Sequence, residues 1–504
     1  MLFDRERVCM RIRYLLVLML IFIFQQVGAV ASAYPGSKKN RFQSNGYQGK
    51  ITDKSTLAVT LNQIIRQSET NADVAVYVKS MRHGDVLYAH NNEAPLVPAS
   101  TLKILTAEAA LIYMGPQYRF ATRLLTDAQS VKNGVLQGNV YLVLSGDPTL
   151  TYNDVVDLMY ALKERNITRI TGNVYVDDTA FDQNYYGYGW NEKDKNSCFA
   201  APISAGIINR NCLPLQVKPA RMAGQAAQIK VSPNHFYPAI QNSVVTKSKR
   251  SRHCGLRLGA DLGSLIALEG CVGLGSYGWG LSYVISDPGS YNKALVKGVL
   301  RQLNVTVDGQ IGFRQAPTRA ARISVHESKP LSDMVHYMLK KSDNIIAAAL
   351  FKKLGQLYFH RPGSWENGSL AVSRILNQHA RMSTYGLRIM DGSGLSKENL
   401  VTSSQMMQAL EYAFRQERIR DPFIGGLPIA GVDGTLKHRM GNLGRKVRAK
   451  TGTIAGVVSL AGYVTAANQE PLAFVIMING RRGMGWRYKS TEDKVVTTLA
   501  RFNR

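Results

Sequence analysis

Strand patterns at the two ends of the chain constrain the fold more than any other feature. Near the beginning, residues 73–78 and 86–88 flank a Gly-containing turn, which predicts a β-hairpin. Near the end, three strands and a closing helix are predicted in succession, over residues 447–452, 457–466, 471–480 and 491–502. We expect both ends to share one antiparallel sheet, so that the middle of the chain is inserted into that domain.

A helix with apolar side chains on nearly every face is predicted after the hairpin. It starts at the Pro98-Ala99-Ser100 string and continues over residues 102–111. A helix of this kind is buried in the core, so Ser100 stands where a central helix begins.

The chain has 504 residues, which is long enough for several domains. Residues 116–319 contain short strands, many turns and four of the five cysteines, which predicts one or two inserted β-rich domains. Residues 57–115 and 320–504 would then be the two parts of a single mixed α/β (α+β) domain, in which helices flank an antiparallel sheet.

The first 33 residues have the pattern of a secretory signal peptide. Four arginines precede an apolar run over residues 14–24, and Ala31-Ser32-Ala33 provides a cleavage site. The apolar run is shorter than the ~20 residues that span a bilayer, so an uncleaved membrane anchor is the weaker interpretation. Residues 34–56 are rich in small and polar side chains and predict an exposed leader. We expect an exported protein, periplasmic or associated with the cell wall, that is cleaved near Ala33.

The cysteines that remain after this cleavage are Cys198, Cys212, Cys254 and Cys271. An even number in an exported protein predicts two disulfides in one of three pairings, of which the two local pairs are favoured. Buried free thiols or a zinc site are the alternatives, but the tight Cys-x-x-Cys spacing of zinc knuckles is absent. We therefore expect no metal.

Positive charge is in large excess, with 62 Lys and Arg against 35 Asp and Glu and a net charge of +27. This excess favours contact with polyanions. We expect an anionic wall or outer-surface polymer rather than nucleic acid. The basic run at residues 247–253 is a candidate patch, although such a run is more often a solvated loop.

Three short motifs carry the chemistry: Ser100-x-x-Lys103, Ser342-Asp343-Asn344 and Lys450-Thr451-Gly452. On a helix, positions i and i+3 share a face, so an unprotonated Lys103 can accept the proton of the Ser100 hydroxyl. Lys450 and Thr451 on a strand edge can hold a substrate carboxylate. Ser342 and Asn344 would line the opposite wall. This combination is the signature of serine β-lactamases and penicillin-binding proteins.

Some of these strings have other interpretations. Ser290-x-x-Lys293 also fits the first motif, but it follows Asp-Pro-Gly and begins an amphipathic helix, which is typical of the surface. The Ser342 motif can equally cap a helix, and both roles can hold together. Residues 273–278 match the dinucleotide pattern Gly-x-Gly-x-x-Gly, but no helix is predicted to open there, so we expect no cofactor.

Three further strings complete a resemblance that covers nearly the whole chain after residue 33. They are Ser-Gly-Asp-Pro-Thr-Leu at 145–150, Asp-Gly-Ser-Gly-Leu-Ser at 391–396 and Ala-Gly-Val-Asp-Gly-Thr-Leu at 430–436. With the three motifs, the sequence resembles the low-molecular-mass class C penicillin-binding proteins, the D-alanyl-D-alanine carboxypeptidase and endopeptidase family of the penicillin-binding protein 4 type. The resemblance implies a transpeptidase/β-lactamase-like domain that is interrupted by inserted domains.

The resemblance also implies an activity and a set of site residues. The chain would act on peptidoglycan stem peptides through an acyl-enzyme on Ser100, with Lys103 as base and Ser342 relaying protons. β-Lactams would inhibit it covalently. Substrate binding would involve Asn344, Lys450, Thr451, Gly452 and Thr453, and the N–H groups of Ser100 and Thr453 would form the oxyanion hole. Asp147 would recognise a free amine of the stem peptide, although an Asp in a Gly-Asp-Pro string is usually a turn former.

Two other functions fit parts of the sequence. A serine β-lactamase shares the three motifs, but the chain lacks a Glu-x-x-Leu-Asn string and has a long insertion, which count against it. A non-catalytic binding protein for wall polymers would use the positive charge, but the intact Ser100, Lys103 and Lys450 speak against a decayed enzyme.

Overall fold

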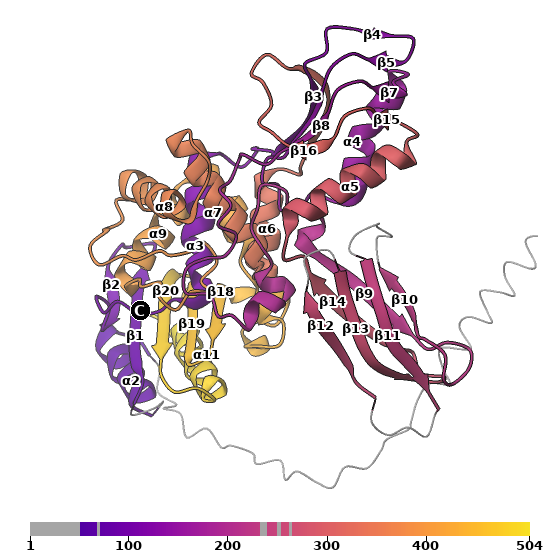
Figure 1. Ribbon diagram of the computed structural model, residues 1–504. Helices are drawn as coiled ribbons and strands as arrows, with labels where there is room; N and C mark the ends of the chain where they lie inside the picture. Colours follow the sequence, from indigo (N-terminus) through magenta and orange to yellow (C-terminus); the bar gives the residue numbers. More distant parts are fainter. Residues whose placement is uncertain (1–50, 68–70, 232–238, 249–253, 262–264) are drawn as a thin grey trace, which may run out of the picture. The chain divides into compact units, whose positions relative to one another are not determined.

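The two ends of the chain form one antiparallel sheet, as the strand pattern predicts. The computed structural model describes residues 51–67, 71–231, 239–248, 254–261 and 265–504. The main sheet has the order β18-β19-β20-β1-β2, with strand bounds Val447–Ile454, Val457–Thr465, Pro471–Asn479, Asp73–Ser80 and Val86–His90. Strand β1 pairs along its whole length with β20, so the indigo and yellow parts of the chain lie side by side (Figure 1).

Helices cover both faces of this sheet. Val74, Val76 and Val78 of β1 pack into a core with α2 (Lys54–Arg66) and α11 (Gly485–Arg501). Ala75 belongs instead to the core of the opposite helical layer. Successive side chains of a strand point to opposite faces. Because both faces are buried, the central strands β19 and β20 are almost wholly apolar.

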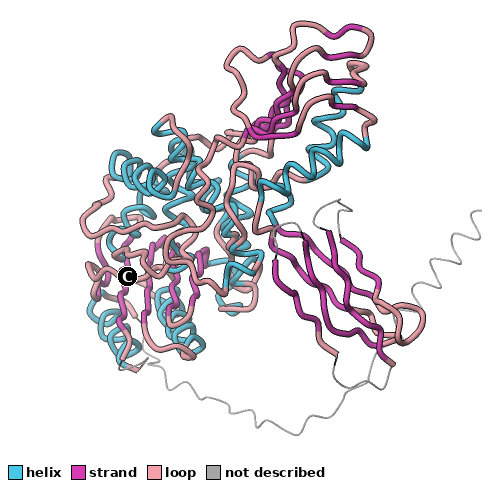
Figure 2. The backbone as a smooth tube through the Cα atoms, viewed as in Figure 1, coloured by secondary structure: helices cyan, strands magenta, loops and turns pink. Residues whose placement is uncertain are grey.

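Helix α3 (Lys103–Tyr113) lies inside the second helical layer, and its residues 103–111 are all buried. The other helices of this layer are α6 (Leu331–Lys341), α7 (Asn344–Phe359), α8 (Trp365–Ala380), α9 (Ser403–Arg415) and α10 (Glu417–Gly426), all cyan in Figure 2. A short 3-10 helix, η1 (Ala99–Leu102), precedes α3 and packs against β18 and β19. The predicted buried helix is confirmed, and its start lies against the sheet.

The first inserted part contains a five-stranded sheet of order β16-β8-β6-β3-β17. Its strands are Ile311–Phe313, Val174–Asp177, Val140–Val143, Ala121–Thr126 and Ala321–Glu327. Because β17 pairs with β3, this sheet continues past residue 319, where the insertion was expected to end. A small sheet of order β15-β7-β5-β4 and two helices complete this part. The strands are β15 (Thr306–Val307), β7 (Arg169–Ile170), β5 (Val135–Leu136) and β4 (Val131–Lys132), and the helices are α4 (Tyr152–Glu164) and α5 (Pro288–Gln302).

The second inserted part consists of two three-stranded sheets. Their orders are β10-β9-β14 (Gln228–Val231, Cys212–Lys218, Trp279–Val284) and β11-β13-β12 (Ala239–Lys247, Leu265–Gly273, Leu256–Asp261). Cys198 pairs with Cys212 and Cys254 with Cys271, at Cα separations of 5.5 and 5.0 Å. The favoured local pairing is confirmed. Residues 249–253 of the basic run lie outside the described residues.

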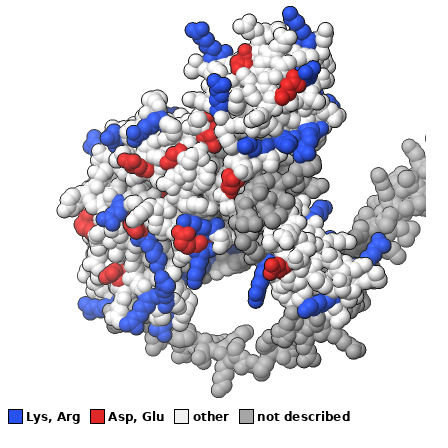
Figure 3. Space-filling view, viewed as in Figure 1, with Lys and Arg blue, Asp and Glu red and all other residues white. Residues whose placement is uncertain are grey.

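The predicted signal peptide and residues 34–50 of the predicted leader also lie outside the described residues. Helix α2 begins at Lys54, slightly before the expected start of the globular part. Within the ranges that the structure describes, no helix is both long and apolar enough to cross a bilayer. Lys and Arg side chains are spread over the face seen in Figure 3, with Asp and Glu among them, so this face carries no single basic patch.

Candidate active site

Ser100 and Lys103 lie where η1 meets α3. The Nζ of Lys103 donates a hydrogen bond of 3.0 Å to the Oγ of Ser100. Lys103 is completely buried, whereas Ser100 is partly exposed. The helical spacing brings the two side chains together. Lys103 can therefore take the hydroxyl proton from inside the protein while Ser100 stays open to a substrate.

The surroundings of Lys103 fix its position and its charge. Its Nζ also donates to the Oδ1 of Asn344 at 2.7 Å and to the carbonyl oxygen of Ser393 at 2.5 Å. Burial lowers the pKa of Lys103 to about 7, although the carboxylates of Asp391 and Asp343 act in the opposite direction. Much of this lysine is therefore neutral near pH 7, which is the form that acts as a base.

Strand β18 brings the Lys450 motif to Ser100. Val447 and Ala449 belong to the core on the α11 side of the sheet, so the alternation turns Lys450 and Gly452 toward η1 and α3. A Cβ atom at Gly452 would lie 2.9 Å from the backbone nitrogen of Ser100. Glycine is therefore required where the strand passes the serine.

The outer edge of β18 supplies backbone donors. The N–H of Ala449 donates to the carbonyl oxygen of Pro428, on the side away from β19. Because N–H directions alternate along an antiparallel strand, those of Thr451 and Thr453 point to the same side. Thr453 is exposed, so its N–H lies at an open edge near Ser100, as an oxyanion hole requires.

The Ser342 motif forms the tight connection between α6 and α7. Ser342 ends α6 in the left-handed region, with φ 58°. Asp343 caps α7, because its Oδ1 accepts from the N–H of Ile346. This turn directs the Oγ of Ser342 to the Nζ of Lys450 at 2.8 Å and Asn344 to Lys103. The helix cap of Asp343 and the contacts of Ser342 and Asn344 with the two lysines therefore exist in the same turn.

Lys450 is a second buried amine in the same site. Its Nζ donates to the Ser342 Oγ and to the carbonyl oxygen of Thr451. Burial lowers the pKa of Lys450 well below its usual range, and the positive charge of Lys103 lowers it further. An arriving carboxylate would supply the counter-charge that a Lys450 ammonium needs. The arrangement suits a base at Lys103 and an anion receptor at Lys450.

Residues 391–396, one of the strings that carry the family resemblance, form a supporting loop. The buried carboxylate of Asp391 accepts from the backbone N–H groups of Ser393, Gly394 and Ser396. It also accepts from the Nε1 of Trp190 at 2.6 Å. The loop thereby presents the Ser393 carbonyl to Lys103. The Asp-Gly-Ser-Gly string is a turn signal, but nothing in the sequence connects it with Trp190.

Asp147 lies in the turn that follows β6. Its Oδ1 accepts from the N–H and the Oγ1 of Thr149 at 2.8 and 2.7 Å, which is the role of a turn former. Its Oδ2 is buried and has no hydrogen-bond partner within the described part of the chain. Burial raises the pKa of Asp147. The residues described here include no hydrogen bond between Asp147 and the three motifs.

The competing Ser290 motif lies on α5. The N–H of Ser290 donates to Asp287, which caps this helix, and the Nζ of Lys293 lies over the ring of Phe313 at 5.7 Å. The lysine therefore faces an aromatic ring rather than the serine hydroxyl. Where the chain is described, no group of three His, Cys, Asp or Glu residues could hold a metal ion.

Comparison with known proteins agrees with this geometry. The model of the D-Ala-D-Ala carboxypeptidase 3 (S13) family matches residues 57–501. The chain belongs to this family. This assignment makes the protein a peptidase and agrees with the resemblance that the motifs carry.

Individual relatives of this S13 family member cover most of its length. D-alanyl-D-alanine carboxypeptidase DacB of Haemophilus influenzae is 32% identical over 430 residues, which are 84% of this chain and 88% of the relative. A D-alanyl-D-alanine carboxypeptidase of Actinomadura sp. (strain R39) is 30% identical over 444 residues, 85% and 81% of the two chains. The crystal structure of penicillin binding protein 4 from H. influenzae matches with a TM-score of 0.77 at 30% identity, over 87% of this chain and 99% of that one. Another crystal structure of that protein is a complex with a β-lactam. The predicted fold is therefore confirmed.

Proposed function

We propose that the protein is a serine-type D-Ala-D-Ala carboxypeptidase in which Ser100 is acylated. The observation that carries this proposal is the 3.0 Å hydrogen bond to Ser100 from a buried Lys103 whose pKa is lowered to about 7. In acylation, the Ser100 proton moves to Lys103 and Oγ bonds to the carbonyl carbon of the penultimate D-Ala. The peptide bond then breaks and the terminal D-Ala leaves. Water hydrolyses the ester and frees Ser100.

The other motif residues bind and orient the substrate in this proposal. Lys450 and Thr451 receive the terminal carboxylate, and Asn344 holds the peptide beside Lys103. The N–H groups of Ser100 and Thr453 stabilise the oxyanion, with Gly452 allowing their close approach. The Ser342 hydroxyl accepts a hydrogen bond from the Nζ of Lys450 and can relay a proton to the leaving amine.

Cleavage of a cross-link between two stem peptides would use the same steps, with a longer leaving group. β-Lactams would acylate Ser100 in place of the peptide. A β-lactamase is the second candidate, and it differs by rapid loss of the drug from the serine. The match to carboxypeptidases over most of the chain favours the peptidase.

Release of D-alanine from a synthetic stem pentapeptide tests the activity. We expect Lys103→Met to reduce kcat/KM by about 10²–10⁴-fold, the usual contribution of a positioned base. Lys163→Met, at an exposed position of α4, is the control. Equal activity of both variants would contradict the role of Lys103. A cross-linked dimer of stem peptides, assayed in parallel, measures the endopeptidase activity relative to the carboxypeptidase activity. Consumption of benzylpenicillin without release of D-alanine would indicate a β-lactamase.

We also propose that Asp147 receives a free amine of the stem peptide. Its unpartnered, buried Oδ2 supports this, because a buried carboxylate oxygen without a donor is costly. Asp147→Asn should lower kcat/KM for a substrate with a free side-chain amine and leave that for the acetylated substrate unchanged. An equal loss on both substrates would indicate a turn former alone.

Export is a further part of the proposal. Two disulfides support an oxidising compartment, periplasmic or at the cell wall. The N-terminal sequence of the protein recovered from cells should begin near Tyr34, and retention of residues 1–33 would contradict cleavage. Binding to anionic wall polymers should weaken steeply with added salt. Binding that does not change with salt would exclude a role for the net charge.

A further inference from the structure

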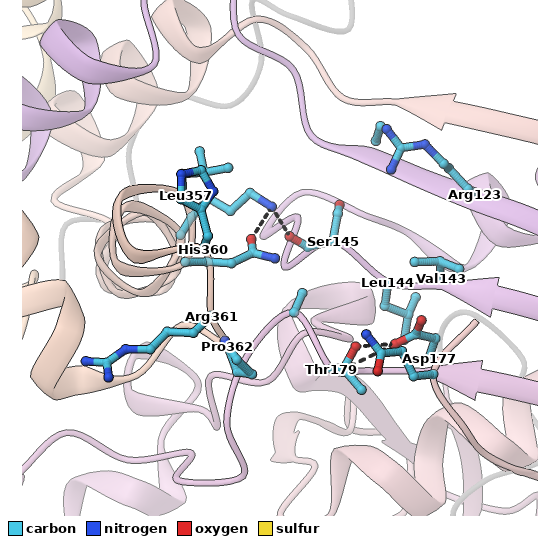
Figure 4. Close-up of a pocket in the computed structure, with 15 residues that line it drawn as sticks. Arg123, Val143, Leu144, Ser145, Asp177, Thr179, Leu357, His360, Arg361 and Pro362 are labelled. Atoms are coloured by element: carbon cyan, nitrogen blue, oxygen red, sulfur yellow. Dashed lines mark hydrogen bonds between the residues drawn. The ribbon is translucent and has the colours of Figure 1, made fainter. Parts of the chain in front are cut away.

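A hollow of about 630 Å³, lined by none of the residues of the three motifs, lies between the inserted sheet and α7 (Figure 4). Strands β3, β6 and β8 line one side, and the second half of α7 with residues 360–362 lines the other. Lys353 of this lining follows Asn344 by nine residues on α7, which is roughly 13 Å along the helix axis. Lys353 is therefore remote from the Ser100 site, whereas Ser145, on the opposite side of the hollow, precedes Asp147 by two residues.

The lining contains three cations, Lys353, Arg123 and Arg361. Lys353 is 6% exposed, and its Nζ donates to the carbonyl oxygen of Ser145 at 3.1 Å and to the Oε1 of Gln356 at 2.6 Å. An ammonium group has three N–H donors, so one remains beyond these two hydrogen bonds. The Nζ also lies 5.6 Å from the centre of the Phe120 ring. Arg123, an exposed residue of β3, lies on the opposite side of the cavity from Leu357 (Figure 4). The guanidinium of Arg361 lies over the ring of Phe359, 5.3 Å from its centre.

No carboxylate of the lining neutralises Arg123 or Lys353. Asp177 is the single acidic residue of the lining, and its oxygens already accept from Thr179 and from the N–H of Ala316. Within the described ranges, neither Arg123 nor Lys353 takes part in an ion pair. Burial and the positive charge of Arg123 together lower the pKa of Lys353 to about 8. A bound anion would relieve this repulsion.

The remaining lining combines an unused hydroxyl with apolar surface. The Oγ of Ser145 is buried and has no partner in the part of the chain that the structure describes. Val143, Leu144 and Leu357 add aliphatic surface. A concave site with a few convergent donors and an apolar lining fits an organic acid better than a phosphate polymer, which needs open, charged surface.

We propose that this cavity binds a carboxylate group of a second peptidoglycan peptide, held by Arg123, Lys353 and the Ser145 hydroxyl. The ligand class rests on the proposed function, since peptides of that polymer end in carboxylates. A peptide held here would keep the enzyme on its polymer while another strand occupies the catalytic site.

Calorimetric titration on the penicillin-acylated protein tests this site, because acylation blocks the catalytic cleft. The probe is an N-acetylated stem tripeptide that lacks both D-alanines and keeps its carboxylates. Arg123→Gln should raise Kd at least about tenfold, because a charge-assisted hydrogen bond is lost. Arg322→Gln is the matched control, an exposed arginine of the adjacent strand β17 that does not line the cavity. The peptide with amidated carboxylates should not bind.

Three results would overturn the proposal: no binding of the probe, equal Kd for Arg123→Gln and wild type, or displacement of the probe by millimolar inorganic phosphate. The last result would indicate a phosphate ligand instead. Equal melting temperatures of the two variants show that folding is not the cause. The extent of acylation by penicillin reports on Ser100 alone, so a failure of the proposed function is seen separately from a failure of this site. If Ser100 is not acylated, the titration is made on Ser100→Ala.

Discussion

Raising the pH from 6 to 8 should increase the rate of Ser100 acylation by benzylpenicillin about tenfold, because Lys103 loses its proton over this range. With a pKa of about 7, about one tenth of Lys103 is neutral at pH 6 and about nine tenths at pH 8. A lysine with the ordinary pKa of 10.5 would be only about 0.3% neutral at pH 8. The profile should therefore level off above pH 8.

Asp343→Asn sharpens this test. The Asp343 carboxylate raises the pKa of Lys103, whereas an asparagine can still cap α7. The variant should move the inflection to lower pH. Asp157→Asn, an exposed position of α4, is the control and should leave it in place. The assay is the second-order acylation constant, measured with a fluorescent penicillin between pH 5.5 and 9. A rate that climbs tenfold per pH unit through pH 9, or one that does not change, would refute a neutral Lys103 as base.

Three further variants test the supports of the site and the core. Gly394→Ala should slow acylation at least about tenfold, because its φ is +82° and the added Cβ would overlap the carbonyl oxygen of Ala99; the fluorescent penicillin assay measures this. Trp190→Phe should lower the free energy of unfolding in urea by about 1.5–3 kcal/mol, because buried Asp391 loses a donor. Glu108→Met should raise the melting temperature at pH 8 and much less at pH 4.5. Burial raises the pKa of Glu108, so wild-type stability falls as the pH rises above the unfolded-state value.

Matched controls make these results specific. Gly386 also has a positive φ, of +68°, but open space around it, so Gly386→Ala should strain the backbone without slowing acylation. Trp486 is 68% exposed, and Trp486→Phe should leave stability unchanged. The reasoning would be contradicted if Gly394→Ala is acylated at the wild-type rate. It would also be contradicted if Trp190→Phe keeps the wild-type urea midpoint, or if Glu108→Met raises the melting temperature equally at pH 8 and pH 4.5.

The features that the sequence predicted well are those with a local pattern. The hairpin of β1 and β2, the three strands of residues 447–479 and the buried helix α3 follow from periodicity, because burial on one or both faces dictates the residue types. The Ser100, Ser342 and Lys450 motifs were found as strings, and the structure brings them together through Lys103 and the Ser342–Lys450 hydrogen bond.

The features that the sequence could not predict depend on contacts across long separations. Trp190 of the insertion donates to Asp391 of the second part, and the Nδ2 of Asn344 donates to the carbonyl oxygen of Phe199. No residue spacing in the sequence predicts such pairs, because they form only when the inserted segment folds against the helical layer. The left-handed conformation of Ser342 is likewise visible only in the structure.

The most direct test of the central claim is the intact mass of the mature protein after incubation with benzylpenicillin, followed by peptide mapping. Wild type and Ser290→Ala should each gain one penicilloyl group on the peptide that contains Ser100, and Ser100→Ala should gain none. An adduct that maps to Ser290, or one that persists in Ser100→Ala, would contradict the assignment of the nucleophile. Consumption of the drug without a lasting adduct would contradict the carboxypeptidase and indicate a β-lactamase.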